Sequence, residues 1–94
     1  MYIVIGKDNC SQCDIAKRLL EIKKEEYLYL HFGVDISEHE LDTIEYNFST
    51  VFRTFPIIFK YEVGKKFIKE LLLTQTSDIR FIGSDNELKK DLLR

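Results

Sequence analysis

The start of the chain alternates between a strand pattern and a helix pattern, and this alternation constrains the fold more than any other feature. Residues 2–5 are a short apolar run closed by a glycine, which is typical of a buried strand. A helical pattern follows, with Asp8 and Asn9 as candidate N-caps and an end near Lys24. Residues 27–32 are rich in aromatics and follow at the distance expected of a βαβ unit, which predicts a second strand parallel to the first.

Two capping boxes predict where two further helices begin. Ser37 with Glu40 opens a helix that we expect over about residues 38–52, with its apolar side chains along one face. Ser84 with Glu87 opens a last helix in the same way.

The region between these helices contains further strands. Residues 57–61 are an apolar run that follows the only proline, and residues 62–65 have the composition of a turn. Two similar segments, 66–68 and 80–82, are candidates for the strand that leads into the last helix, and we favour the second because it adjoins a glycine. The rest of this stretch predicts an added hairpin or a helical segment.

Composition indicates one folded domain over residues 1–94. The chain is 45% hydrophobic and 13% aromatic, which argues for a packed core and against disorder. Its formal net charge of −2 predicts no electrostatic attraction to nucleic acid or to a membrane surface. No apolar run approaches roughly 18 residues and a strand pattern stands in place of a signal peptide, so we expect a cytoplasmic protein.

Cys10 and Cys13 are the only cysteines, and the motif Cys-Ser-Gln-Cys stands where the first strand gives way to the first helix. A thiol at a helix start lies close to unpaired backbone N–H groups and to the positive end of the helix dipole, and both favour the thiolate. An ordinary cysteine thiol has a pKa of about 8.5, whereas at helix N-termini and in Cys-X-X-Cys pairs the value falls to roughly 3.5–7.5. We therefore expect Cys10, exposed at the helix tip, to be a nucleophile and Cys13, one turn inside, to be the resolving thiol.

Two other interpretations of the cysteine pair stay open. Both residues can be inert small hydrophobic side chains. Zinc is the other alternative, but it takes about four ligands, and the only histidines, His31 and His39, lack finger spacing. We therefore expect no metal site.

Three motifs follow one another along the chain: Lys-x-x-Cys-x-x-Cys over residues 7–13, Thr-x-Pro over residues 54–56 and Gly-x-Asp over residues 83–85. In this order they resemble the motifs of the glutaredoxins, in the thioredoxin-fold superfamily, as a dithiol type with an atypical Cys-Ser-Gln-Cys site. The likeness covers nearly the whole chain except about residues 62–80. The departures are Ser11-Gln12 for the family's usual Pro-Tyr, Ile82 for a glycine and Asn86 for an aspartate.

The resemblance implies an α/β, thioredoxin-like fold: a central mixed four-stranded sheet, about three flanking helices and an insertion near residues 62–80 before the last helix. It also implies that Pro56 is a cis-proline against the cysteine pair. The backbone N–H and C=O of Phe55 would then face the site and pair with a substrate strand. A trans-proline that merely begins an edge strand is the alternative.

The resemblance further implies a glutathione site beside the cysteines. Backbone N–H groups at Gly83, Ser84 and Asp85 would bind the γ-glutamyl carboxylate, and the Asp85 side chain would take the ammonium group. An ordinary serine cap after a turn glycine is a compatible alternative. The implied glutathione-binding residues are Lys7, Gln12, Arg53, Thr54, Phe55, Pro56, Gly83, Ser84 and Asp85.

Lys7 and Arg53 are the cations of this set. By resemblance, either would stabilise the Cys10 thiolate or hold the glycyl carboxylate of glutathione. Exposed lysine and arginine side chains are more often simply solvated, which is the alternative for both.

The implied activity is glutathione-dependent reduction of protein disulfides or of glutathione mixed disulfides. The Cys10 thiolate would attack, and Cys13 or a second glutathione would resolve the mixed disulfide. Glutathione is the co-substrate, disulfide-containing or glutathionylated proteins are the partners, and a monomer is expected.

Two alternative functions stay open. The first is a redoxin recharged by thioredoxin reductase that serves one protein partner such as ribonucleotide reductase. The second is a thioredoxin-fold protein without enzymatic activity, either a binding module or an iron–sulfur carrier. By resemblance to glutaredoxins that lack the intervening proline, the carrier would hold a cluster between two protomers through Cys10 and glutathione.

Overall fold

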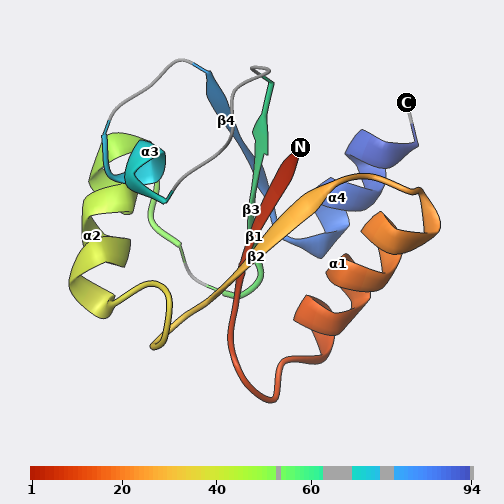
Figure 1. Ribbon diagram of the computed structural model, residues 1–94, viewed down its shortest axis with the longest axis horizontal. Coiled ribbons are helices and arrows are strands. Elements are labelled where there is room, and N and C mark those ends of the chain that lie inside the picture. Colours follow the sequence, from red (N-terminus) through yellow and green to blue (C-terminus); the bar gives the residue numbers. More distant parts are fainter. Residues whose placement is uncertain (53, 63–68, 75–77, 94) are drawn as a thin grey trace.

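The computed structural model describes residues 1–52, 54–62, 69–74 and 78–93, which form four strands and four helices in strict βαβαβαβα order (Figure 1). The elements are β1 (Tyr2–Gly6), α1 (Ser11–Ile22), β2 (Tyr27–His31), α2 (Glu38–Asn47), β3 (Ile57–Tyr61), α3 (Glu70–Leu73), β4 (Ile79–Gly83) and α4 (Asp85–Leu92).

The strands form one mixed sheet in the order β2-β1-β3-β4. β1 is parallel to β2 and antiparallel to β3, which is itself antiparallel to β4. In this register Ile3 lies between Leu28 and Phe59 on the neighbouring strands. The arrangement is thioredoxin-like, as the resemblance implies.

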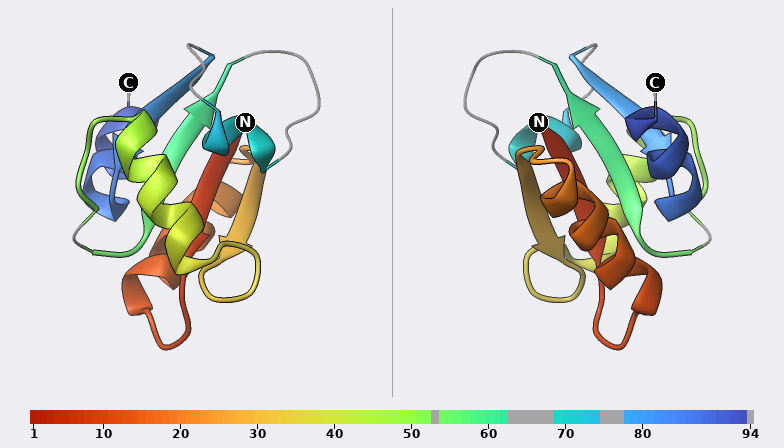
Figure 2. Two further views of the ribbon diagram at one scale, coloured as in Figure 1. Left: turned by 90° about the vertical axis from the view of Figure 1, so that its left-hand side faces the viewer. Right: turned by 90° about the vertical axis from the view of Figure 1, so that its right-hand side faces the viewer.

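Helices cover both faces of the sheet. α1 and α4 lie together on one face, and α2 and α3 lie on the other (Figures 1 and 2). β1 is buried at all five positions because alternate side chains enter two separate cores. Ile3 and Ile5 join the core under α2 and α3, whereas Tyr2 and Val4 join the core under α1 and α4.

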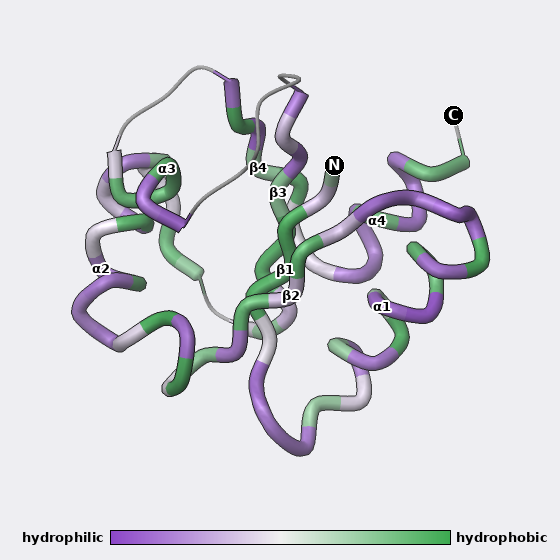
Figure 3. The backbone as a smooth tube through the Cα atoms, in the orientation of Figure 1, coloured by the Kyte–Doolittle hydropathy of each residue, from purple (hydrophilic) through white to green (hydrophobic). Residues whose placement is uncertain are grey.

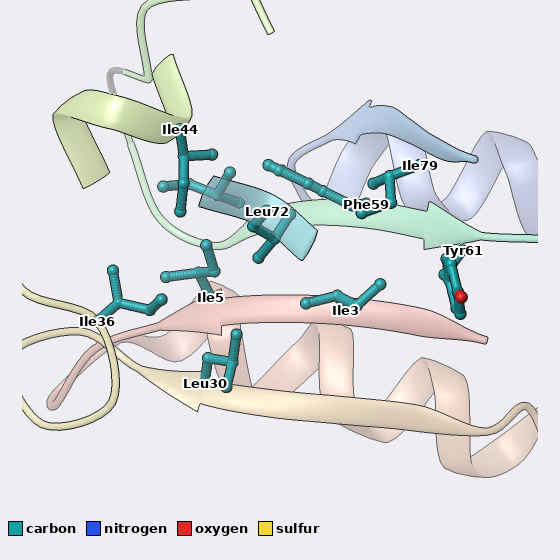
Figure 4. Close-up of a cluster of buried hydrophobic side chains, with 10 residues drawn as sticks. Ile3, Ile5, Leu30, Ile36, Ile44, Phe59, Tyr61, Leu72 and Ile79 are labelled. Carbon is teal, nitrogen blue, oxygen red and sulfur yellow. The ribbon is translucent and has the colours of Figure 1, made fainter. Parts of the chain in front are cut away.

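The larger core lies on the α2 and α3 side of the sheet. Figure 4 shows Ile44 of α2 and Leu72 of α3 over Ile5 and Phe59 of the two central strands. Phe59 is fully buried and is surrounded by three further rings, with centroid distances of 4.8, 5.9 and 5.5 Å to Phe48, Phe52 and Phe81. The hydrophobic colouring of most of β1 in Figure 3 follows from burial on both faces.

The structure confirms most of the predicted elements. The second strand is parallel to the first, residues 57–61 form β3, and the strand before the last helix is the one that adjoins Gly83. Both capping boxes are present, at Ser37 and Ser84. The alternative strand at 66–68 and most of the predicted turn at 62–65 lie outside the described residues.

α3 forms within the insertion, where a hairpin or a helical segment was expected, and it is the fourth helix of the described residues beside the three that flank the sheet in the prediction. Two predictions about helices are wrong. α2 ends at Asn47 and not near residue 52, since Ser49 has a φ of 52° and turns the chain. The N-cap of α1 is Cys10 and neither of the two polar residues predicted for it.

The described part of the chain has no helix with both the length and the apolar character needed to cross a bilayer.

Candidate active site

Three chain segments meet at one end of the sheet. β1 ends there, β3 begins there because it is antiparallel to β1, and β4 ends there and leads into α4. The loop after β1 carries the cysteine pair, so the sheet topology gathers the three sequence motifs at one place (Figure 1).

Cys10 and Cys13 are joined by a disulfide at the start of α1, with their Cα atoms 5.3 Å apart. Cys10 is the N-cap of α1 in extended conformation, and the Cys13 backbone N–H donates to Cys10 Sγ over 3.2 Å. This bond satisfies one of the backbone donors that a helix start leaves unpaired. The predicted position of the cysteines at a helix start is therefore confirmed.

The two cysteines differ in their access to solvent. Cys13 is 1% exposed beneath the first turn, and Cys10 is 8% exposed, so the prediction of an exposed Cys10 is wrong for this disulfide form. The segment before β3 covers the sulfur, since Cys10 Sγ lies 3.9 Å from the Phe55 carbonyl oxygen. Cys10 nevertheless borders an open groove that Cys13 does not reach.

The groove beside Cys10 has a volume of about 700 Å³. It brings together side chains from all three segments, most of them predicted as site residues. Its lining is Lys7, Asn9, Cys10, Gln12, Ile15, Thr54, Phe55, Ser84, Asp85 and Asn86.

A smaller pocket of about 290 Å³ adjoins the groove and shares Thr54 and Ser84 with it. Pro56 and Gly83, the other predicted site residues of these two segments, line this smaller pocket. The Phe55–Pro56 peptide bond is cis, as the resemblance implies. Arg53 lies outside the described residues.

Lys7 stands at the β1 side of the groove. Its ammonium nitrogen is 5.3 Å from the centroid of the Phe55 ring, a cation–π arrangement that holds the charge near the segment before β3. The neighbouring Asp8 is 2.9 Å from His31 Nε2 at the end of β2, which ties the cysteine loop to the sheet. His31 thus has a structural contact at the end of β2.

The start of α4 is closed by a side chain of the same helix. Glu87 Oε1 accepts hydrogen bonds from the Ser84 backbone N–H and from Ser84 Oγ, both over 2.8 Å. The hydrogen bond from the Ser84 backbone N–H is the main reason why the pKa of Glu87 is lowered, followed by the bond from the Ser84 hydroxyl. Gly83 has a φ of 130°, and a Cβ at this position would lie 2.7 Å from Glu87 Cγ.

Sequence reasoning missed Ile15, the role of Asn9 and the effect of Glu87. Ile15 is 41% exposed in the groove, and the available signal was an isoleucine away from the apolar face of α1. Asn9 adopts a φ of 54°, which asparagine tolerates better than most residues. The sequence predicts Glu87 as a helix cap. It does not show that the Ser84 donors that Glu87 occupies lie beside the groove.

Within the described residues, no group of three or more histidine, cysteine, aspartate or glutamate side chains is placed to hold a metal ion. The reactive groups at the groove are those of the cysteine pair. The disulfide lies at a helix start, where Cys10 borders the groove and Cys13 is buried under the first turn of α1.

Comparison with known proteins adds no family assignment. No protein-family model matches the chain, and no curated protein matches it at a significant level.

Proposed function

We propose that this protein is a dithiol thiol–disulfide oxidoreductase in which Cys10 is the nucleophile and Cys13 the resolving thiol. The observation that carries the proposal is the asymmetric cysteine pair at the start of α1. Both sulfurs are within bonding reach, but only Cys10 borders the groove.

The helix start favours the thiolate form of Cys10 in the reduced protein. The Cys13 backbone N–H already points at Cys10 Sγ, and a hydrogen bond to a charged acceptor is roughly twice as strong as a neutral one. The positive end of the α1 dipole acts in the same direction. Thiolate at Cys10 is the attacking species that disulfide exchange requires.

The reaction balances without a further cofactor. The Cys10 thiolate attacks one sulfur of a substrate disulfide, and the other substrate sulfur leaves as a thiolate and takes up a proton. Cys13 then loses its proton and attacks Cys10 Sγ, which releases the second substrate thiol. Two electrons pass from the dithiol to the substrate, and the protein ends with the Cys10–Cys13 disulfide.

The segment before β3 supplies a surface for the substrate backbone. The Phe55 carbonyl lies 3.9 Å from Cys10 Sγ, and Phe55 lines the groove. An extended substrate segment that pairs with Phe55 would place its disulfide at Cys10. Disulfide-containing proteins are the substrate class that this geometry favours.

Glutathione is the proposed electron donor that returns the disulfide to the dithiol. Lys7, Gln12 and Asp85 line the same groove as Cys10, which supports this proposal because glutathione carries both carboxylates and an ammonium group. A redoxin recharged by a thioredoxin reductase is the second candidate, and one observation favours it. The Ser84 backbone N–H, expected to bind a glutathione carboxylate, already donates to Glu87.

The test is a steady-state assay with a small neutral disulfide, run with wild type, Cys10→Ser and Cys13→Ser. Turnover should be lost in Cys10→Ser, whereas Cys13→Ser should still form a mixed disulfide through Cys10 that only a glutathione thiol can resolve. Persistent turnover in Cys10→Ser would refute the assignment of the nucleophile. Replacing glutathione and its reductase by thioredoxin reductase in the same assay separates the two electron donors.

A further inference from the structure

The Glu87 carboxylate folds back over the start of its own helix. One of its oxygens, Oε1, accepts from both the backbone N–H and the hydroxyl of Ser84. These donors lower the pKa of Glu87, so the side chain carries a negative charge at neutral pH. The start of α4 therefore already holds an anion that belongs to the protein.

This anion lines the smaller pocket that adjoins the groove beside Cys10. Ser84 and Thr54 line both the groove beside Cys10 and the smaller pocket that contains Glu87, so the two hollows are neighbours there. Asp85 adds a second carboxylate on the α4 side of the groove, and Lys7 lies in the segment after β1. The α4 side of the groove is thus acidic.

The backbone accommodates this arrangement. Gly83 adopts a φ of 130°, and a side chain there would collide with the Cβ and Cγ atoms of Glu87. The glycine therefore leaves the space through which Glu87 reaches back to Ser84.

We propose that Glu87 is a specificity-determining residue that occupies the start of α4 in place of a substrate carboxylate. It disfavours disulfides that bring a carboxylate to this position, glutathione disulfide included, relative to neutral disulfides. The inference rests on the proposed thiol–disulfide exchange at Cys10 and specifies which substrates that exchange prefers.

The test measures how fast the pre-reduced protein is oxidised by two small disulfides, glutathione disulfide and the neutral 2-hydroxyethyl disulfide. Samples are quenched with acid, alkylated and weighed by mass spectrometry, which distinguishes the dithiol from the disulfide. The quantity compared is the ratio of the two second-order rate constants within each variant, so a general change in reactivity cancels.

Glu87→Gln keeps a side-chain oxygen for Ser84 but removes the charge. Two like charges a few ångströms apart near a surface repel by up to about 1 kcal/mol, so the ratio should rise about two- to fivefold in favour of glutathione disulfide. Glu40→Gln is the matched control, because Glu40 Oε1 accepts from the Ser37 backbone N–H over 2.9 Å at the start of α2. It removes the same charge from the same kind of cap, outside the groove, and should leave the ratio unchanged.

A ratio that stays constant or falls in Glu87→Gln, while exchange at Cys10 persists, overturns the inference and leaves the proposed function intact. If neither disulfide oxidises the dithiol of the wild-type protein, both proposals fail together.

A second measurement on wild type needs no folded variant. It compares two glutathione disulfide analogues, one amidated at the glutamyl α-carboxylates and one at the glycyl carboxylates, which have equal net charge. The glutamyl amide should react about two- to fivefold faster than the glycyl amide. Equal rates, or a slower glutamyl amide, would show that a substrate carboxylate is not repelled at the start of α4.

Discussion

Replacing Tyr2 with phenylalanine removes a single hydroxyl group that joins α4 to the centre of the sheet. The Tyr2 hydroxyl donates to Asp91 Oδ2 over 2.6 Å. Tyr2 is 2% exposed and the Asp91 side chain 7%, so water cannot readily replace the lost partner. The bond fixes the last turn of α4, the helix whose first residues line the groove.

The expected loss of stability follows from the remaining partners of the carboxylate. A hydrogen bond to a charged group contributes about 1.5–3 kcal/mol. In the variant, Asp91 keeps Arg80 Nη2 at 3.5 Å and Lys60 Nζ at 4.0 Å, so its charge is not left unpaired. We therefore expect the free energy of unfolding to fall by about 1.5–2 kcal/mol at pH 7, at the lower end of this range.

Tyr27→Phe is the matched control. Its hydroxyl donates to Glu21 Oε2 over 2.7 Å, a bond of the same chemistry on the exposed surface. Water replaces that partner, so the cost should stay within about 0.5 kcal/mol. Both variants are measured by urea unfolding with the disulfide intact. Equal losses for Tyr2→Phe and Tyr27→Phe would refute the reasoning from burial.

The effect of Tyr2→Phe should also depend on pH. The hydrogen bond from Tyr2 is the main cause that lowers the pKa of Asp91, followed among the lowering causes by Lys60 and Arg80. A carboxyl group with a lowered folded pKa contributes stability that is present above its unfolded pKa, about 3.9, and is lost as the pH falls through the folded value. The gap between wild type and variant should therefore be constant from pH 7 to 5 and shrink below about pH 4. A gap that grows on acidification would contradict this assignment.

Two further substitutions test the core and the turn before α4. Phe59→Ala removes a fully buried ring packed against three others and should lower the free energy of unfolding, measured in urea, by about 3–5 kcal/mol. A loss below about 1.5 kcal/mol would mean that the core collapses to fill the cavity. Gly83→Ala places a Cβ against Glu87 at a φ of 130° and should lower the free energy of unfolding by about 1–3 kcal/mol in the same measurement. Unchanged stability would show that this turn relaxes freely.

Strands and helix starts were predictable because their causes are local or repeated along the chain. β1 and β3 lie between two helix layers, so nearly all of their residues are buried and their sequences are apolar except for Lys60. The starts of α2 and α4 were predictable because the cap and its partner are three residues apart.

Helix ends were harder to predict because an apolar pattern outlasts the helix that carries it. Phe48 and Phe52 continue the face of α2 in spacing, yet the helix ends at Asn47 and the chain turns at Ser49. Phe52 still reaches Phe59 in the core from the following loop, and Glu45 Oε2 accepts its backbone N–H over 2.7 Å. Contacts with Phe59 of the sheet hold these rings in place whether or not the backbone is helical.

The amino-acid order alone was enough to identify the cysteine pair, its position at a helix start and the alternating strands and helices, because each depends on neighbours within a few residues. Tertiary structure alone decided how deep Cys10 lies and that the start of α4, with its Glu87 cap, lies beside the groove. Both depend on segments that are distant in sequence and that the sheet brings to one end: the residues before β3 cover the sulfur, and the turn after β4 sets Glu87 beside the groove.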